Sequence, residues 1–185
     1  MPNIITAASA AALFVMLFSD SKLGAINAML LKNGWVEETI NFVSGKTQAR
    51  VMIMFIQTWM WFGNTMIMLM SGIMGISPSL FEAADIDGAS SMQTFWRVTL
   101  PLLSPIMVYT VVTSMIGGLQ MFDVPQILTN GTGEPGRTSM TLIMFLNKHL
   151  FSKNYGMAGA LSVLLFIITA FMSFLVFKFS GNKED

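Results

Sequence analysis

The sequence predicts an all-α membrane protein, a polytopic bundle of about four spanning helices. Of its 185 residues, 54% are hydrophobic and only 11% are charged, whereas a soluble domain carries about 25% charged residues. The mean hydropathy is correspondingly high, at +0.65. Apolar runs without Asp, Glu, Lys or Arg recur along the chain, and in lipid a helix satisfies the backbone of such a run internally.

The four apolar runs cover residues 4–18, 51–74, 101–122 and 156–177. A helix needs about 20 apolar residues to cross a bilayer, so the last three are long enough and the first is short. No basic residue precedes the first run, as one would in a signal peptide. We therefore interpret it as a membrane helix whose upstream part is missing, and the chain as N-terminally shortened.

The composition disfavours several classes of function. Ten basic residues are balanced by ten acidic ones without a basic cluster, so we expect no nucleic-acid partner. The chain has no cysteine and one histidine, His149, which leaves little for a metal site or an enzyme. Residues 44–47 end like a phosphate-binding loop, but Ile40 stands where that loop needs glycine. We expect no cofactor and no ATP bound by this chain itself.

The gap between the second and third runs, residues 75–100, predicts a helical hairpin. Ser77 is a suitable N-cap, and Pro78 then occupies the first helical position, where its missing N–H does no harm. Two helical turns are expected over 80–87. Gly88 is placed to end them in a left-handed conformation.

A second short helix is expected directly after this glycine. Ser90 and Gln93 have the spacing of a capping box, which predicts a helix over 92–98. Pro101 is expected to end that helix and to open the next span. The gap therefore reads as helix, glycine turn and helix, and an ordinary interfacial hairpin is as compatible with this pattern as a docking element.

The order of residues in this gap resembles the EAA loop of ABC importer permeases. Glu82-Ala83-Ala84 is followed by Gly88 and then by Val98, Leu100 and Pro101, with Val98 where the family has isoleucine. The longer string resembles the carbohydrate-uptake branch, the maltose and glycerol-3-phosphate type permeases. The resemblance implies a single ABC transmembrane type-1 permease domain over 1–185, with 75–100 as a cytoplasmic coupling loop. The residues implied to couple to an ATPase are Glu82, Ala83, Ala84, Asp87, Gly88, Phe95 and Pro101.

The family resemblance also implies the partners and the location of the chain. They are a second permease subunit, two ATP-binding subunits, an extracytoplasmic solute-binding protein and the lipid bilayer of the bacterial inner membrane, which the chain crosses several times. The positive-inside rule gives the opposite orientation, because seven of the ten basic residues lie in gaps 19–50 and 123–155. We follow the motif, since a specific ordered pattern outweighs a charge bias in a shortened chain.

Polar residues within the runs indicate where a solute could pass. Gln57, Trp61 and Asn64 recur on one face of the second run, and amide groups beside a flat ring suit a sugar. Thr110 and Ser114 share a face of the third run. Packing between helices is the competing interpretation, especially for the hydroxyl residues.

The sequence thus predicts a permease subunit that moves a sugar or a related solute across the inner membrane, with ATP hydrolysed by another subunit. The alternatives are a non-transporting membrane protein for assembly or signalling and an inactive permease fragment. A membrane enzyme is disfavoured, because no run carries a pair of carboxylate, histidine or cysteine side chains for catalysis.

Overall fold

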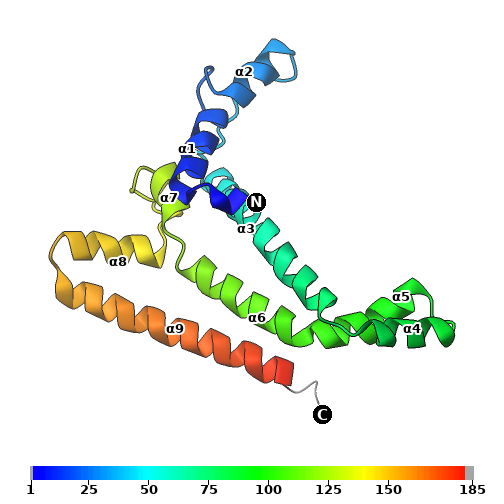
Figure 1. The fold of residues 1–185 in the computed structure, drawn as a ribbon. Helices are drawn as coiled ribbons and strands as arrows, with labels where there is room; N and C mark the ends of the chain where they lie inside the picture. The colour runs from blue at the N-terminus through cyan, green and yellow to red at the C-terminus, as the bar shows by residue number, and fades with distance from the viewer. Residues whose placement is uncertain (1, 182–185) are drawn as a thin grey trace. The chain divides into compact units, whose positions relative to one another are not determined.

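The structure, a computed structural model, describes residues 2–181, and every regular element among them is helical (Figure 1). Three helical segments in this part are long and apolar enough to cross a membrane: Lys46–Met74, Ser91–Leu128 and Tyr155–Lys178. They contain α3 (Lys46–Met74), α6 (Leu100–Leu119) and most of α9 (Tyr155–Gly181). The all-α class is confirmed, with three membrane-length segments in the described residues where about four were expected.

The first expected span, 4–18, is shorter in the structure than predicted. A 3-10 turn, η1 (Pro2–Ile4), is separate from α1 (Ala7–Leu17), which begins where the Thr6 hydroxyl accepts the backbone N–H of Ser9. Eleven helical residues rise roughly 16 Å, against a hydrocarbon core of about 30 Å. By itself, α1 is therefore not of membrane length.

Shorter helices fill the connections. They are α2 (Ala25–Lys32), α4 (Pro78–Ile86), α5 (Ser91–Thr94), α7 (Asp123–Leu128) and α8 (Leu142–Phe151), together with the π-helical turn η2 (Phe95–Thr99). The chain forms two compact units, the first from residues 1–63 and 118–166 and the second from 64–117 and 167–185.

The core of the first unit joins α1, the first half of α3 and α7. Its buried side chains are Ala10, Met52, Ile53, Ile56, Met60, Val124 and Leu128. The core residues of α3, Met52, Ile53, Ile56 and Met60, have the i, i+1, i+4, i+8 spacing of one helical face. At the edge of this core, the ring of Phe14 lies 5.3 Å from Trp59 and 5.9 Å from Phe55, both edge-on.

The segment between α1 and α3 is fixed by two polar side chains. Asn27, wholly buried in α2, donates to the carbonyls of Ser19 and Ile40 at 3.0 Å and accepts the N–H of Ile40 at 2.9 Å. The carboxylate of Asp20 accepts the backbone N–H groups of Val43 and Ser44, each at 2.9 Å, and the Ser44 hydroxyl. These hydrogen bonds join the beginning of the segment, at Ser19 and Asp20, to its end, at Ile40 to Ser44.

In the second unit, the chain runs helically from Ser91 to Leu119 without a break. The prediction that Pro101 ends the second short helix is therefore wrong. The turn before it widens into η2, where the N–H of Leu100 bonds to the carbonyl of Phe95, five residues back. In an α-helix, Pro101 would lack an N–H and its ring would crowd the carbonyl four residues back. The widened turn relieves this conflict, so the helix continues through Pro101.

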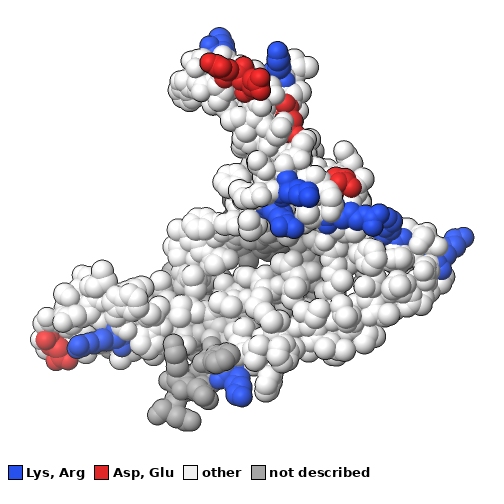
Figure 2. Space-filling model, turned by 180° about the vertical axis from the view of Figure 1, so that it is seen from behind, with Lys and Arg blue, Asp and Glu red and all other residues white. Residues whose placement is uncertain are grey.

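The surface suits a lipid environment over the long helices. On the face drawn in Figure 2, Lys, Arg, Asp and Glu occupy small separate areas, and most of the surface is uncharged. Along Tyr155–Lys178, Phe166, Phe171 and Phe174 are all exposed, and only small parts of the helix, at Ala158 and Leu165, are buried. Exposed apolar area of this extent indicates a lipid or protein neighbour.

Candidate functional site

The hairpin of α4 and α5 is ordered by hydrogen bonds at the ends of its two helices. Pro78 stands at the start of α4 as predicted, but the Ser77 hydroxyl pairs with the Ser79 hydroxyl at 2.8 Å instead of capping the helix backbone. At the other end, Gly88 has φ +72°. The N–H of Ala89 bonds to the Ala84 carbonyl at 2.9 Å. This is the left-handed helix end expected at Gly88.

The second arm begins at once with the predicted capping box. The Ser90 hydroxyl accepts the N–H of Gln93 at 3.4 Å, and the Gln93 side chain accepts the N–H of Ser90 at 2.8 Å. The arm then passes through η2 into α6 (Figure 1). On η2 the rings of Phe95 and Trp96 stand edge to face, 5.5 Å apart.

The side chains of the hairpin point outward. Neither α4 nor α5 contains a buried residue. Of the residues predicted to couple, Ala84 is half-buried, whereas the others are exposed: Glu82, Ala83, Asp87, Gly88, Phe95 and Pro101. Five of the expected coupling residues therefore lie on α4 and the glycine turn, whereas Phe95 lies on η2 and Pro101 in the first turn of α6.

The hairpin also exposes large apolar residues that the sequence motif did not single out. Ile86 is 86% exposed and Met92 is 66% exposed, beside Trp96 at 59%. Three carboxylates lie in the same segment, Glu82, Asp85 and Asp87, against one guanidinium, Arg97. Large exposed apolar side chains rimmed by polar groups are typical of a protein or membrane interaction site.

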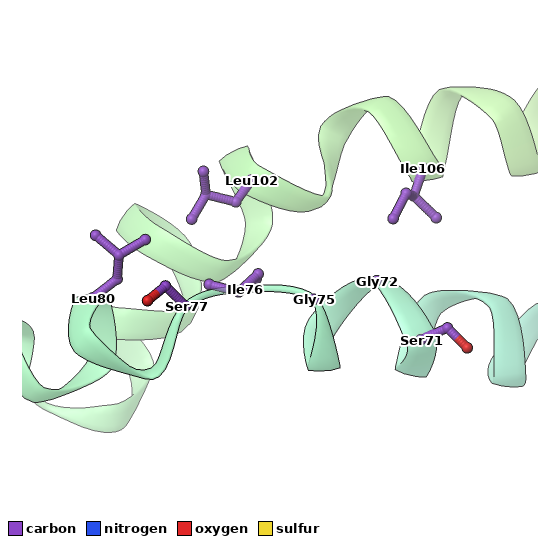
Figure 3. A pocket seen from close by; sticks show the side chains of 8 residues that line it. All are labelled: Ser71, Gly72, Gly75, Ile76, Ser77, Leu80, Leu102 and Ile106. Carbon is purple, nitrogen blue, oxygen red and sulfur yellow. The ribbon is translucent and has the colours of Figure 1, made fainter.

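Close to the hairpin, α3 and α6 meet at a glycine. A Cβ added to Gly72 would lie 2.5 Å from the Cδ1 atom of Ile106 and 2.7 Å from a Cδ atom of Leu103. A groove of about 390 Å³ lies beside this contact (Figure 3). Its lining comes from the end of α3, the start of α4 and the start of α6: Ser71, Gly72, Gly75, Ile76, Ser77, Leu80, Leu102 and Ile106. Sequence reasoning missed Gly72, because a glycine within an apolar run does not reveal its neighbour.

The polar face predicted on α3 is distinct from the core face. Gln57 is half-buried, Trp61 is 48% exposed, and Asn64 is exposed. The side chains that α3 gives to the core of the first unit are one position away, at Ile56 and Met60. The face with Gln57, Trp61 and Asn64 is therefore not occupied by the core of the first unit.

The two hydroxyl residues predicted on α6 differ in their surroundings. Thr110 is buried, and its hydroxyl donates to the Ile106 carbonyl at 2.7 Å and lies 3.8 Å from the sulfur of Met68. This favours helix packing for Thr110, because the hydroxyl is satisfied by its own helix. Ser114, one turn further along α6, is exposed, as is Asn64, one turn before Met68.

Comparison with known proteins identifies the family of this chain from a match along nearly its whole length. Residues 1–180 match the family described as binding-protein-dependent transport system inner membrane component. A lactose transport system permease protein of Rhizobium radiobacter is 33% identical over 186 residues, covering 100% of this chain and 62% of the relative. An arabinooligosaccharides transport system permease protein of Bacillus subtilis is 29% identical over 98% of this chain and 58% of the relative.

Two solved structures share the fold. One is a bacterial ABC transporter involved in import of the acidic polysaccharide alginate, with TM-score 0.77 and 23% identity over 98% of this chain and 62% of the matched chain. The other is a bacterial alginate ABC transporter in complex with a pentasaccharide-bound periplasmic protein, with TM-score 0.81 and 24% identity over 97% and 62%. The chain thus spans about three-fifths of the length of these relatives.

Proposed function

Because this chain belongs to the family of binding-protein-dependent transport system inner membrane components, we propose that it is a permease subunit of an ATP-driven importer. One observation carries the proposal. The hairpin of α4 and α5 has defined caps at the glycine turn and at the start of its second arm, has no buried side chain, and joins two helical segments of membrane length. An element so ordered and so exposed is suited to receive a partner rather than to fill a core.

The proposed cargo is a sugar. Two relatives that match 98% or more of this chain are named as permeases for lactose and for arabinooligosaccharides. These names support a carbohydrate over other solutes. We assign the chain to the inner membrane, crossed several times, with a second permease subunit beside it. The proposed assembly includes two ATP-binding subunits and an extracytoplasmic solute-binding protein, and a related transporter has been solved with its periplasmic protein.

In the proposed mechanism, the ATPase subunits hold the hairpin around Glu82 and Gly88. A Cβ at Gly88 would meet nothing within 4 Å, so the turn leaves open space that a partner's surface can enter. Closure of the ATPases on ATP moves the hairpin and with it α3 and α6. The bundle then exchanges an inward-facing for an outward-facing cavity, which couples two distant sites through a two-state element.

The proposed solute path uses the polar face of α3. Gln57 and Asn64 offer amide donors and acceptors to hydroxyl groups, and the exposed ring of Trp61 offers an apolar surface to a sugar ring. Ser114 on α6 can add a hydroxyl. Thr110 fits this role less well, because its hydroxyl already donates to the Ile106 carbonyl.

Cysteine labelling tests the docking surface directly, because the chain has no cysteine of its own. In the assembled transporter, a single cysteine from Ile86→Cys should react with an impermeant maleimide only from the cytoplasmic side, and only after the ATPase subunit is removed. Trp35→Cys, exposed in the segment before α3, is the matched control and should react from outside with or without the ATPase. Labelling of the Ile86→Cys variant from outside, or labelling indifferent to the ATPase, would refute the proposal.

An uptake assay separates transport from the alternatives. Gly88→Val places a β-branched residue at φ +72° and adds bulk where the partner is proposed to sit. The variant should insert in the membrane while ATP hydrolysis no longer drives solute uptake. If unmodified transporter shows no ATP-dependent uptake at all, the non-transporting membrane protein or the inactive fragment becomes the better interpretation.

A further inference from the structure

We propose that Gly72, Leu103 and Ile106 form a pivot, the point about which movement of the α4–α5 hairpin changes the angle between α3 and α6. This inference rests on the proposed function and deepens it, because it names the positioning residues through which ATP-driven movement of the hairpin reaches the membrane helices. The three residues belong to the second unit of the chain.

The first support is the closeness of the contact. The place where a Cβ of residue 72 would stand is 2.5 Å from Cδ1 of Ile106 and 2.7 Å from a Cδ of Leu103, which is shorter than carbon atoms tolerate. A side chain at residue 72 would have to push the ends of Leu103 and Ile106 aside or move the helices apart. Small residues are the usual means by which membrane helices come into close contact.

The second support is the kind of contact. The atoms of α6 that meet Gly72 are terminal methyl groups, which attract by dispersion and without directional preference. The polar contact one turn away, from the Thr110 hydroxyl to the Met68 sulfur, is long at 3.8 Å, and a thioether is a weak acceptor, so it constrains the helix angle little. A methyl-on-glycine contact holds the helices together and still lets them turn.

The third support is the free space on the hairpin side. The groove of about 390 Å³ lies between the contact and the hairpin, bounded by Ser77 and Leu80 on one wall and Leu102 on the other (Figure 3). A change in the angle at Gly72 would narrow or widen this groove. On the far side of the contact, the same change would separate or bring together the stretches that carry Asn64 and Ser114.

The neighbouring glycines lack this combination. A Cβ at Gly75 would meet only carbonyls of Ser71 and Gly72 at 3.4 Å or more, and one at Gly117 would meet nothing within 4 Å. Alanine at these two positions should therefore leave the helix contact unchanged. Gly117→Ala on α6 is the matched control for substitution at Gly72.

The test uses the whole importer in proteoliposomes, with its ATPase subunits and binding protein. Gly72→Leu should lower uptake per ATP about tenfold through overpacking of the contact, while ATP hydrolysis stays within about twofold of wild type. The double variant Gly72→Leu with Ile106→Ala removes the nearer of the two obstructing methyl groups and leaves that of Leu103, so it should recover part of the coupling. Gly72→Ala should have a small effect, because side-chain ends can rotate away, and Gly117→Ala should have none.

A distance measurement keeps the proposal falsifiable even if Gly72→Leu fails to fold. Spin labels on Ser77→Cys and Leu102→Cys, the only cysteines in that variant of this chain, report the width of the groove with Gly72 intact. The distance should differ between nucleotide-free and ATP-trapped transporter, and Gly72→Ala should narrow that difference. An equal distance in both states would overturn the pivot.

The outcomes also separate this inference from the proposed function. If wild-type transporter shows no ATP-dependent uptake, the proposed function fails and the pivot fails with it. If uptake is normal in wild type and equally normal in Gly72→Leu, the importer stands and only the pivot is refuted. If the double variant is no better coupled than Gly72→Leu alone, the defect is not one of contact volume and the pivot is refuted as well.

Discussion

Two connecting segments of this chain are ordered by opposite means. The segment between α1 and α3 is closed by side chains that reach across the turn, with Asn27 wholly buried and Asp20 accepting two backbone N–H groups. The α4–α5 hairpin is ordered by short-range caps, the left-handed turn at Gly88 and the capping box of Ser90 with Gln93, whose bonds stay within five residues of the chain. Its side chains are free of the chain's own core.

In the first segment, the polar side chains bond to the chain itself, whereas the hairpin leaves most of its side chains exposed for contact with another protein. A buried amide with all its hydrogen bonds made fixes one arrangement, because every alternative leaves polar groups unpaired. Short-range caps keep a hairpin helical with only the side chains of Ser90 and Gln93, and they leave its other side chains facing outward. The α4–α5 hairpin can therefore meet another protein with a surface that is already ordered, which lowers the entropic cost of binding.

The largest effect should come from Asn27→Ala, which breaks the first segment. The substitution leaves the N–H of Ile40 and the carbonyls of Ser19 and Ile40 without their partner. Local opening should become easier by about 3 kcal/mol, which is roughly a hundredfold faster hydrogen exchange at the Ile40 amide. Exchange mass spectrometry of the purified transporter measures this directly.

Asn41→Ala is the control for that experiment, because Asn41 lies next to Ile40 and is exposed. Its exchange pattern should match wild type. The α4–α5 hairpin should be unaffected in both variants. Unchanged exchange at Ile40 in Asn27→Ala would mean that side chains do not hold this segment.

A smaller effect is expected at Gly88, where the hairpin depends on a left-handed residue. Gly88→Ala should ease opening of the turn by about 1.5 kcal/mol, seen as exchange roughly tenfold faster at the Ala89 amide. Gly88→Asn should stay near wild type in this measurement, because asparagine tolerates the left-handed region. The Cβ atom that either substitution adds would have no neighbour within 4 Å.

The same pair of variants then separates folding from docking. If the hairpin fits closely into an ATPase subunit, Gly88→Asn should keep its exchange pattern and still lose uptake, since its side chain fills the space left for the partner. Normal uptake by Gly88→Asn would indicate that the turn needs only its backbone conformation. Bulk at Gly88 would then not explain the loss expected for Gly88→Val.

The sequence predicted the parts of the molecule that depend on near neighbours in the chain. The left-handed end at Gly88 and the capping box of Ser90 with Gln93 follow from contacts within five residues, and both are present. Pro101 was misjudged because the π-turn before it, which lets the helix continue, leaves no residue pattern of its own.

Contacts between residues far apart in the chain could not be predicted from the sequence. Asn27 bonds to a residue 13 positions away, and nothing in its own neighbourhood distinguishes it from an exposed asparagine. Gly72 meets α6 across more than thirty residues, and its spacing from other residues does not reveal this. Thr110 and Ser114 share one face of α6 in the sequence pattern, but their surroundings differ. Thr110 is buried against Met68, whereas Ser114 is exposed.

The smallest expected effect compares two serines that begin the two arms of the hairpin. Ser90 bonds through its hydroxyl to the N–H of Gln93, whereas the Ser77 hydroxyl pairs only with that of Ser79, and the Leu80 N–H bonds to the Ser77 carbonyl at 3.1 Å. Ser90→Ala should cost about 1 kcal/mol and speed exchange at the Gln93 amide about fivefold. Ser77→Ala keeps the carbonyl, so exchange at the Leu80 amide should not change. Equal effects of the two substitutions would show that the side-chain cap adds nothing to the second arm, and the order of the hairpin would then have to come from its glycine turn alone.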